Sequence, residues 1–237
     1  MIKSSDQEKS KPEGEGRRPG RRRRNDAGDR ARAQIVDAAL RTLLVEGYAG
    51  TSARAVAATG GFSAASIFYH FGSVDALLLA VMDQVSGERI ARYRSRLRDV
   101  STLAALAAAM EELYAEDLRR GHLTAVQEIV AGMAFDERLG AEILARMQPW
   151  FDFATELATR ILADSPLRGA VDPAVIGAAV IALYLGQEIV ARMRPGDAGG
   201  SQTMVAMLSE AAPWIDQLLG KSAASRRRRP PSPISVD

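Results

Sequence analysis

The stretch TSARAVAATGGFSAASIFYHF, residues 51–71, decides the fold of this chain. Thr51 and Ser52 before one apolar segment, and Ser63 before the next, are residue types that open helices by capping their first turn. Between the two segments, a glycine pair ending at Gly61 supplies a position free to take positive φ. Two short helices joined by a tight glycine turn form a helix-turn-helix, whose second helix can enter the major groove of DNA. The pattern predicts a DNA-binding protein.

The segment from about residue 30 to residue 82 resembles the DNA-binding domain of the tetracycline-repressor (TetR) family of transcriptional regulators. The matching pieces are IVDAAL and EGY in a first helix, the helix-turn-helix with FYHF at its end, and Ser73 opening a further helix. Three positions depart from the usual pattern, because Gly60 stands where alanine is usual, Phe68 where tyrosine often touches phosphate, and Val74 where lysine commonly meets the DNA backbone. The resemblance implies a dimeric regulator, usually a repressor, with a ligand-binding helical body.

Contacts to DNA are expected from the helix-turn-helix and from the basic arm before it. The second short helix has few long polar side chains, so base readout is expected to rest on alanine contacts to thymine methyl groups, on serine and tyrosine, and on DNA shape. The candidate DNA-binding residues are Thr51, Ser52, Arg54, Ser63, Ala64, Ala65, Ser66, Phe68, Tyr69 and His70, with Arg21, Arg22, Arg23 and Arg24 of the arm.

Basic charge is concentrated outside the predicted DNA-binding head. Residues 31–85 contain three arginines and four acidic residues, a net charge of −1, and the run RRPGRRRR at residues 17–24 comes shortly before them. An arbitrary charge run is most often a solvated tail. Beside a charge-poor head, however, a basic arm can lie in a minor groove as homeodomain arms do. We favour DNA contact for this arm and a solvated tail for residues 226–229.

Composition predicts an all-α protein. The chain has 237 residues, of which 47% are hydrophobic, so it can bury a sizeable core. Glycine and proline breaks divide long alanine- and leucine-rich runs, and no strand-like alternation is sustained. We expect an N-terminal three-helix helix-turn-helix DNA-binding domain and a C-terminal helical ligand-binding and dimerisation domain. The chain has no cysteine, and we find neither a signal peptide nor a membrane-spanning run, which favours a cytoplasmic protein.

The expected organisation has four parts. They are a disordered basic arm at residues 1–27, the helix-turn-helix domain at 28–85, the effector-binding and dimerisation domain at 86–220, and a disordered basic tail at 221–237. The first helix is expected to run from about residue 30 to residue 46, where Gly47 ends it. A long helix opened by Ser73 should connect the head to the body, so its tilt is the natural means of transmission between them.

A helix opened by Asp172 is apolar nearly all round. A helix that is hydrophobic on every face is buried on every face, so one face is expected to meet a second copy of the chain. The resemblance implies the same arrangement, in which the last two helices of each copy form a four-helix dimer interface. The alternative is a core helix buried within one chain. The candidate dimerisation residues are Val175, Ala179, Ala182 and Gly186.

The resemblance also implies a ligand pocket among the helices behind the head. Pockets combine apolar walls with few polar anchors, and the candidate ligand-binding residues are Tyr114, His122, Gln127, Trp150 and Phe153. Two histidines alone do not make a zinc site, and phosphate-binding loops and nucleophile elbows do not occur. We therefore expect no metal, no cofactor and no enzymatic activity.

The leading hypothesis is a homodimeric transcriptional repressor that binds a palindromic operator in double-stranded DNA and is released by an unknown small-molecule effector. A nonspecific or architectural DNA-binding module, driven by its arginine arms, is the main alternative. Sequence dependence of the DNA affinity separates the two, because phosphate contacts carry no base information.

Overall fold

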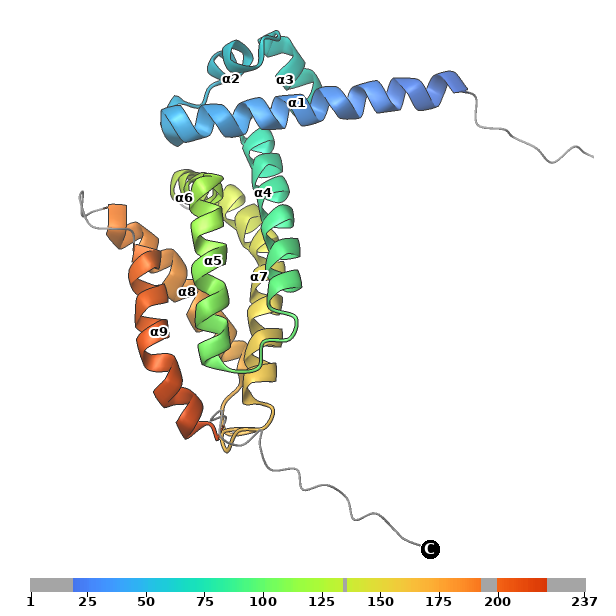
Figure 1. The fold of residues 1–237 in the computed structure, drawn as a ribbon. Helices are drawn as coiled ribbons and strands as arrows, with labels where there is room; N and C mark the ends of the chain where they lie inside the picture. The colour runs from blue at the N-terminus through green and yellow to red at the C-terminus, as the bar shows by residue number, and fades with distance from the viewer. Residues whose placement is uncertain (1–18, 134–135, 193–199, 221–237) are drawn as a thin grey trace, which may run out of the picture.

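The fold is described from a computed structural model that defines residues 19–133, 136–192 and 200–220. These residues form nine helices and contain no β-strand, which confirms the expected fold class for this part of the chain. Figure 1 shows their order. The helices are α1 (Pro19–Gly50), α2 (Ala53–Gly60), α3 (Ala64–Phe71), α4 (Val74–Arg96), α5 (Leu103–Arg119), α6 (His122–Met133), α7 (Glu137–Leu162), α8 (Pro173–Arg192) and α9 (Gly200–Leu218).

The helices form a small head and a larger body (Figure 1). In the head, α1 lies across the top of the body, and α2 and α3 lie on its far side. From the head, α4 descends into the body alongside α5, α6 and α7, while α8 packs against α7 and α9 packs against α5. Because α4 begins against the head and runs down through the body in this view, it is placed to couple them.

The first helix is longer than the sequence suggested. It begins at Pro19, so residues 19–27 are helical and the expected disordered arm is wrong for them. Proline suits a first helical turn, where no backbone N–H is needed for the helix. The helix breaks at Gly47, whose φ of 68° and ψ of −178° are non-helical. This is the residue at which the sequence predicted its end. Arg17 and Arg18, and the tail at 221–237, lie outside the described residues.

Short-range caps set the boundaries of the helix-turn-helix. The Ser52 hydroxyl accepts a hydrogen bond from the backbone N–H of Ala55 at 3.2 Å, which opens α2. Gly61 ends α2 in the left-handed conformation, with φ 69° and ψ 31°. The Ser73 hydroxyl in turn accepts from the N–H of Ala76 at 3.0 Å and opens α4.

One continuous hydrophobic core joins the head to the body. Leu77 of α4 belongs to the same cluster as Ile35 of α1 and Ile67 of α3. Tyr93 and Leu97, at the other end of α4, belong to it as well. A tilt of α4 therefore cannot change the packing on one side without disturbing the other. The most deeply buried large side chains are Leu43, Val56, Ile67, Leu77, Leu78, Val81, Met82, Val85, Leu97, Leu123, Ile129 and Met133.

A second contact between head and body runs from α1 to α6. The Glu128 carboxylate of α6 accepts a hydrogen bond from the backbone N–H of Tyr48 at 2.7 Å, just after the kink in α1. Gly132 lies against the Tyr48 ring, where an added Cβ atom would be 2.2 Å from Cγ. Glycine at position 132 thus lets α6 approach the end of α1 closely.

Among the described residues, no single helix is long and apolar enough to cross a membrane. The bent pair α3 and α4, which meet at 72°, passes such a test by length and composition alone. Its apolar residues, such as Ile67 and Leu78, are part of the buried core.

Candidate functional site

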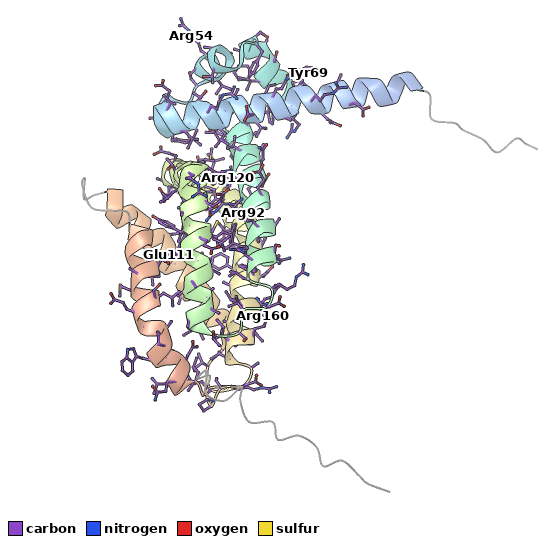
Figure 2. All side chains as sticks on the ribbon, viewed as in Figure 1. Arg54, Tyr69, Arg92, Glu111, Arg120 and Arg160 are labelled. Carbon is purple, nitrogen blue, oxygen red and sulfur yellow. The ribbon has the colours of Figure 1, made fainter. Side chains whose placement is uncertain are left out.

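The second helix of the helix-turn-helix, α3, presents one face to the core and the other to solvent. Ile67 is completely buried, whereas Tyr69 is 85% exposed and Phe68 is 52% exposed. Tyr69 and Arg54 of α2 lie across α1 from the body helices (Figure 2). Nothing in the described residues covers this side, so α3 is accessible to a DNA groove.

The hydroxyl groups around the turn are engaged within the head. The Ser63 and Ser66 hydroxyl oxygens lie 3.0 Å apart and share a hydrogen bond, so Ser63 opens α3 without capping it through its side chain. Ser52 caps α2 and remains exposed. These serines can reach phosphate oxygens only by exchanging or sharing their present bonds.

Arg32 of α1 contacts the C-terminal end of α3 and holds it in position. Its Nη1 donates to the carbonyl oxygen of His70 at 2.8 Å, and its guanidinium carbon lies 4.1 Å from the centre of the Phe71 ring. A cation over an aromatic ring at an exposed site contributes about 0.5–1 kcal/mol. Arg32 is therefore a positioning residue for the recognition helix, which sequence reasoning missed because its partners are 38 residues away.

The body encloses a cavity of about 290 Å³ between α4, α7, α8 and their neighbours. Its walls are largely apolar, with Leu97 of α4 and Ile181 of α8 among them. The polar or amphipathic groups on its wall are Arg89, Tyr93, Trp150 and Tyr184. Apolar walls with a few convergent polar groups are typical of small-molecule sites.

A buried charged cluster borders this cavity. Arg89 is 5% exposed, and its Nε donates to Asp117 Oδ2 at 2.7 Å. The Tyr93 hydroxyl donates to the same oxygen at 3.0 Å, and Arg92 pairs with the other carboxylate oxygen. Burial lowers the pKa of Arg89, but two neighbouring tyrosines and Asp117 raise it more, so the guanidinium stays charged. Burial also raises the pKa of the Tyr93 hydroxyl, which remains a neutral donor.

Sequence comparison identifies the head. Residues 35–81, from α1 into α4, match the family described as "Bacterial regulatory proteins, tetR family". This match assigns the head, residues 35–81, to the DNA-binding domain of the tetR family. No curated protein sequence matches it significantly.

Solved structures of regulators share the fold of this chain. The fatty acid degradation regulator FadR from Bacillus halodurans is 14% identical, with 76% of this chain and 93% of that chain covered and a TM-score of 0.62. A transcriptional regulator from Saccharomonospora viridis in complex with choline is 18% identical, with coverage of 77% and 95% and a TM-score of 0.62. AibR, in complex with isovaleryl coenzyme A and operator DNA, is 23% identical, with coverage of 77% and 98% and a TM-score of 0.56. At these identities the similarity shows the fold.

Most candidate DNA-binding residues of the head are exposed or half-exposed in the structure. Two candidates differ from the expectation. Thr51 is only 6% exposed and its hydroxyl donates to the carbonyl of Gly47 at 2.7 Å, so it braces the kink of α1 instead of facing DNA. Ala64 is partly buried against the core. The exposed or half-exposed candidates are Ser52, Arg54, Ser63, Ala65, Ser66, Phe68, Tyr69 and His70. The backbone of Arg21, Arg22, Arg23 and Arg24 is part of α1.

The candidate ligand-binding residues divide into two groups. Trp150 and Phe153 line the cavity, with their rings 6.4 Å apart in an edge-to-face arrangement. Tyr114, His122 and Gln127 do not line it. Tyr114 packs with Leu123 and Val205 in a separate cluster, and His122 is buried with Nε2 3.7 Å from the Glu88 carboxylate. The sequence reasoning missed Arg89, because an arginine in a helix gives no sign of its burial.

The candidate dimerisation residues lie on a helix that is only partly covered. In the single chain, α8 buries Ile181 and Gly177 but leaves Val175 63% exposed. Ala179 and Ala182 are exposed and Gly186 is half-buried. The expectation that α8 is buried on every face therefore does not hold within one chain. Gly177 meets α7, where its Cβ would be 2.8 Å from the Thr155 hydroxyl, so the small residue there serves contact within the chain.

Proposed function

We propose that this tetR-family DNA-binding regulator is a homodimeric repressor that leaves a palindromic operator when a small molecule occupies the body cavity. The observation that carries the proposal is the course of α4. Its Leu77 and Leu78 belong to the core around the recognition helix, while Arg89 and Tyr93 form the cavity wall. A ligand that favours one tilt of α4 thereby favours one placement of the head.

Structures with the same fold support the ligand-binding half of the proposal. AibR was solved with both isovaleryl coenzyme A and operator DNA, and the Saccharomonospora viridis regulator was solved with choline. These ligands are chemically unlike, so the shared fold does not by itself specify an effector. The chemical class of the effector must therefore be inferred from the residues that line the cavity of this chain.

Exposed apolar side chains on α8 and α9 support the dimer. Val175, Val180 and Leu183 of α8 are 63%, 47% and 52% exposed, and Trp214 and Leu218 of α9 are 72% and 77% exposed. Large exposed apolar patches mark interaction sites. A second copy related by two-fold symmetry covers such a patch with the same residues, and it places two recognition helices for the two halves of a palindrome.

The nonspecific-binding alternative is favoured by the charge of the chain. Residues 31–85 carry a net charge of −1, so the four arginines at 21–24 in the N-terminal part of α1 must supply much of the phosphate attraction. Such attraction carries no sequence information. Sequence-specific binding is supported by the exposed side chains of α3, above all Tyr69, which is 85% exposed and can reach base edges in a groove.

The test begins with DNA fragments selected from a genomic library by the full-length protein. We expect the selected fragment to bind at least about 1,000-fold tighter than a scrambled one at physiological salt, the lower bound for specific binding. Equal affinities would support the nonspecific alternative. Effector control then requires a ligand that changes operator affinity by about 5- to 150-fold.

The dimer surface is tested by Val180→Glu on α8, with Val45→Glu on α1 as the control because Val45 is 80% exposed. We expect V180E to sediment as a monomer and to lose operator binding, because two half-sites are then bound independently. V45E should remain dimeric. A V180E protein that dimerises and binds DNA like the wild type would show that this face of α8 is not the interface.

A further inference from the structure

The cluster beside the cavity has more positive than negative charge. Two guanidinium groups, those of Arg89 and Arg92, share the single carboxylate of Asp117. The Tyr93 hydroxyl also donates to that carboxylate, which adds a donor and no charge. Within the described residues, the cluster therefore holds one uncompensated positive charge at a buried position.

Arg89 brings this charge to the cavity wall. Its Nε is bound to Asp117, but among the described side chains its Nη2 reaches only the Tyr184 hydroxyl oxygen, at a long 3.4 Å. Its guanidinium carbon lies over the Trp150 ring, 4.8 Å from the ring centre, so the group is held against an aromatic wall of the same cavity. A guanidinium fixed in this way has donors left for an acceptor inside the cavity.

The other described charged groups near the cluster do not neutralise it. The Glu88 carboxylate lies 3.7 Å from His122 Nε2, its side chain is 46% exposed, and it does not line the cavity. Burial lowers the pKa of His122, so this side chain adds no positive charge at neutral pH. Among the described lining residues of the cavity there is no aspartate or glutamate. A buried charge without a full partner is costly, and an anion in the cavity would offset that cost.

The rest of the cavity sets the shape of the ligand. Its volume of about 290 Å³ corresponds to about ten water volumes. Its other walls are chiefly leucine, valine, isoleucine, methionine and aromatic side chains. The cavity therefore suits a ligand that has one charged end and a compact apolar body.

We propose that the effector is a small monoanionic amphiphile, a carboxylate with an apolar body of on the order of ten non-hydrogen atoms, whose acid group binds Arg89. The inference rests on the proposed function in one respect, namely that the cavity is the effector site. It adds the sign of the ligand's charge and the residue that selects it. A neutral or cationic ligand of equal length is expected to bind more weakly, because neither brings a negative charge to pair with Arg89.

The test uses octanoate, octan-1-ol and octylammonium, which share one chain and differ in the charge of the head group. Binding to the full-length protein without DNA is measured by titration calorimetry. We expect octanoate to bind at least about tenfold tighter than octan-1-ol, the gain from one charge-assisted hydrogen bond, and octylammonium to bind weakest. Equal or better binding of octan-1-ol or octylammonium, or no binding by any of the three, would overturn the inference.

Substitution of Arg89 tests whether this residue causes the preference for the acid. Arg89→Met should weaken octanoate binding by about 10- to 150-fold and leave octan-1-ol within about threefold, so the preference for the acid is lost. Asp117 keeps Arg92 and Tyr93 as partners in this variant, and binding of octan-1-ol reports an intact cavity. Arg94→Met is the matched control, since Arg94 is on the same helix with a 52% exposed side chain and does not line the cavity. An unchanged preference in R89M, or an equal loss in R94M, would refute the assignment.

The two proposals fail in different ways. If octanoate binds with the expected preference but leaves operator affinity unchanged, effector control is wrong and the ligand class stands. If octanoate shows no preference while another molecule releases the operator, the ligand class is wrong and effector control stands.

Discussion

The hydrogen bond between Glu128 and the backbone of Tyr48 is predicted to stabilise the junction of head and body. Tyr48 follows Gly47, where α1 leaves helical geometry, so its N–H lacks the partner that a continuous helix would supply. The Glu128 carboxylate accepts this N–H at 2.7 Å in a partly buried setting, and the two residues are 80 positions apart. Glu128→Ala removes the acceptor and leaves the N–H to whatever water can reach it.

The magnitude follows from the type of bond. A hydrogen bond to a charged group contributes about 1.5–3 kcal/mol, and partial access of water reduces the loss, so we expect E128A to lower the free energy of unfolding by about 1–2 kcal/mol. For a chain of this length, each kcal/mol shifts Tm by about 2–4 °C, which gives a fall of about 2–8 °C. Glu128→Gln keeps an oxygen acceptor without the charge and should lose about half as much.

Equilibrium urea unfolding, followed by circular dichroism, measures both variants. Glu111→Ala is the control, because Glu111 is an exposed glutamate of α5 (Figure 2) and its removal should change stability by less than about 0.5 kcal/mol. If E128A were as stable as E111A, the bond would not hold the head to the body. If E128Q lost as much as E128A, the bond would depend on the negative charge of the carboxylate, and a neutral acceptor of the same shape would not replace it.

Three other predictions concern the head, the arm and a buried histidine. Tyr69→Ala should abolish operator binding in a gel-shift assay with Tm unchanged, because Tyr69 is 85% exposed, whereas Ile67→Ala should lower the free energy of unfolding by about 2–5 kcal/mol, because Ile67 is completely buried; the reverse pattern would misplace the recognition helix. Deleting residues 1–24 should flatten the plot of log affinity against log salt by up to about 0.9 for each phosphate that the arm neutralises in the full-length protein, and equal slopes would mean that the arm does not touch DNA. Burial lowers the pKa of His122, so the unfolded chain takes up a proton that the folded chain resists, and stability should be present above about pH 6.5 and decrease as the pH falls below it. His122→Gln should reduce this decrease between pH 7 and pH 5, and an unchanged pH profile of urea midpoints would contradict it.

The sequence by itself determined the helix-turn-helix, because its signals are local. Ser52 and Ser73 each bond to a backbone N–H three residues ahead, and Gly61 needs only its own backbone angles to end a helix. Such features depend on residues within one helical turn, and they are visible in the printed order of the chain. The apolar character of α8 was equally visible, since composition alone reveals it.

Only the tertiary structure decided which side chains are covered and which partners they have. Thr51 has the residue type of an exposed cap, yet its bond to Gly47 buries it at the kink of α1. Arg89 and Asp117 are 28 residues apart and meet because α4 and α5 pack together. The same holds for Arg32, whose contact with His70 spans 38 residues. Pairings of this kind depend on how helices are placed against each other, and helical periodicity describes one helix at a time.

The recognition helix and the cavity also differ in how far the sequence predicts them. Exposure of Tyr69 could be predicted, because Ile67 on the same short helix had to face the core. The cavity could not be predicted, because its wall is assembled from side chains of separate helices and its volume is what their packing leaves unfilled. Periodicity along a helix says which face turns inward, and only the packed structure says what that face meets.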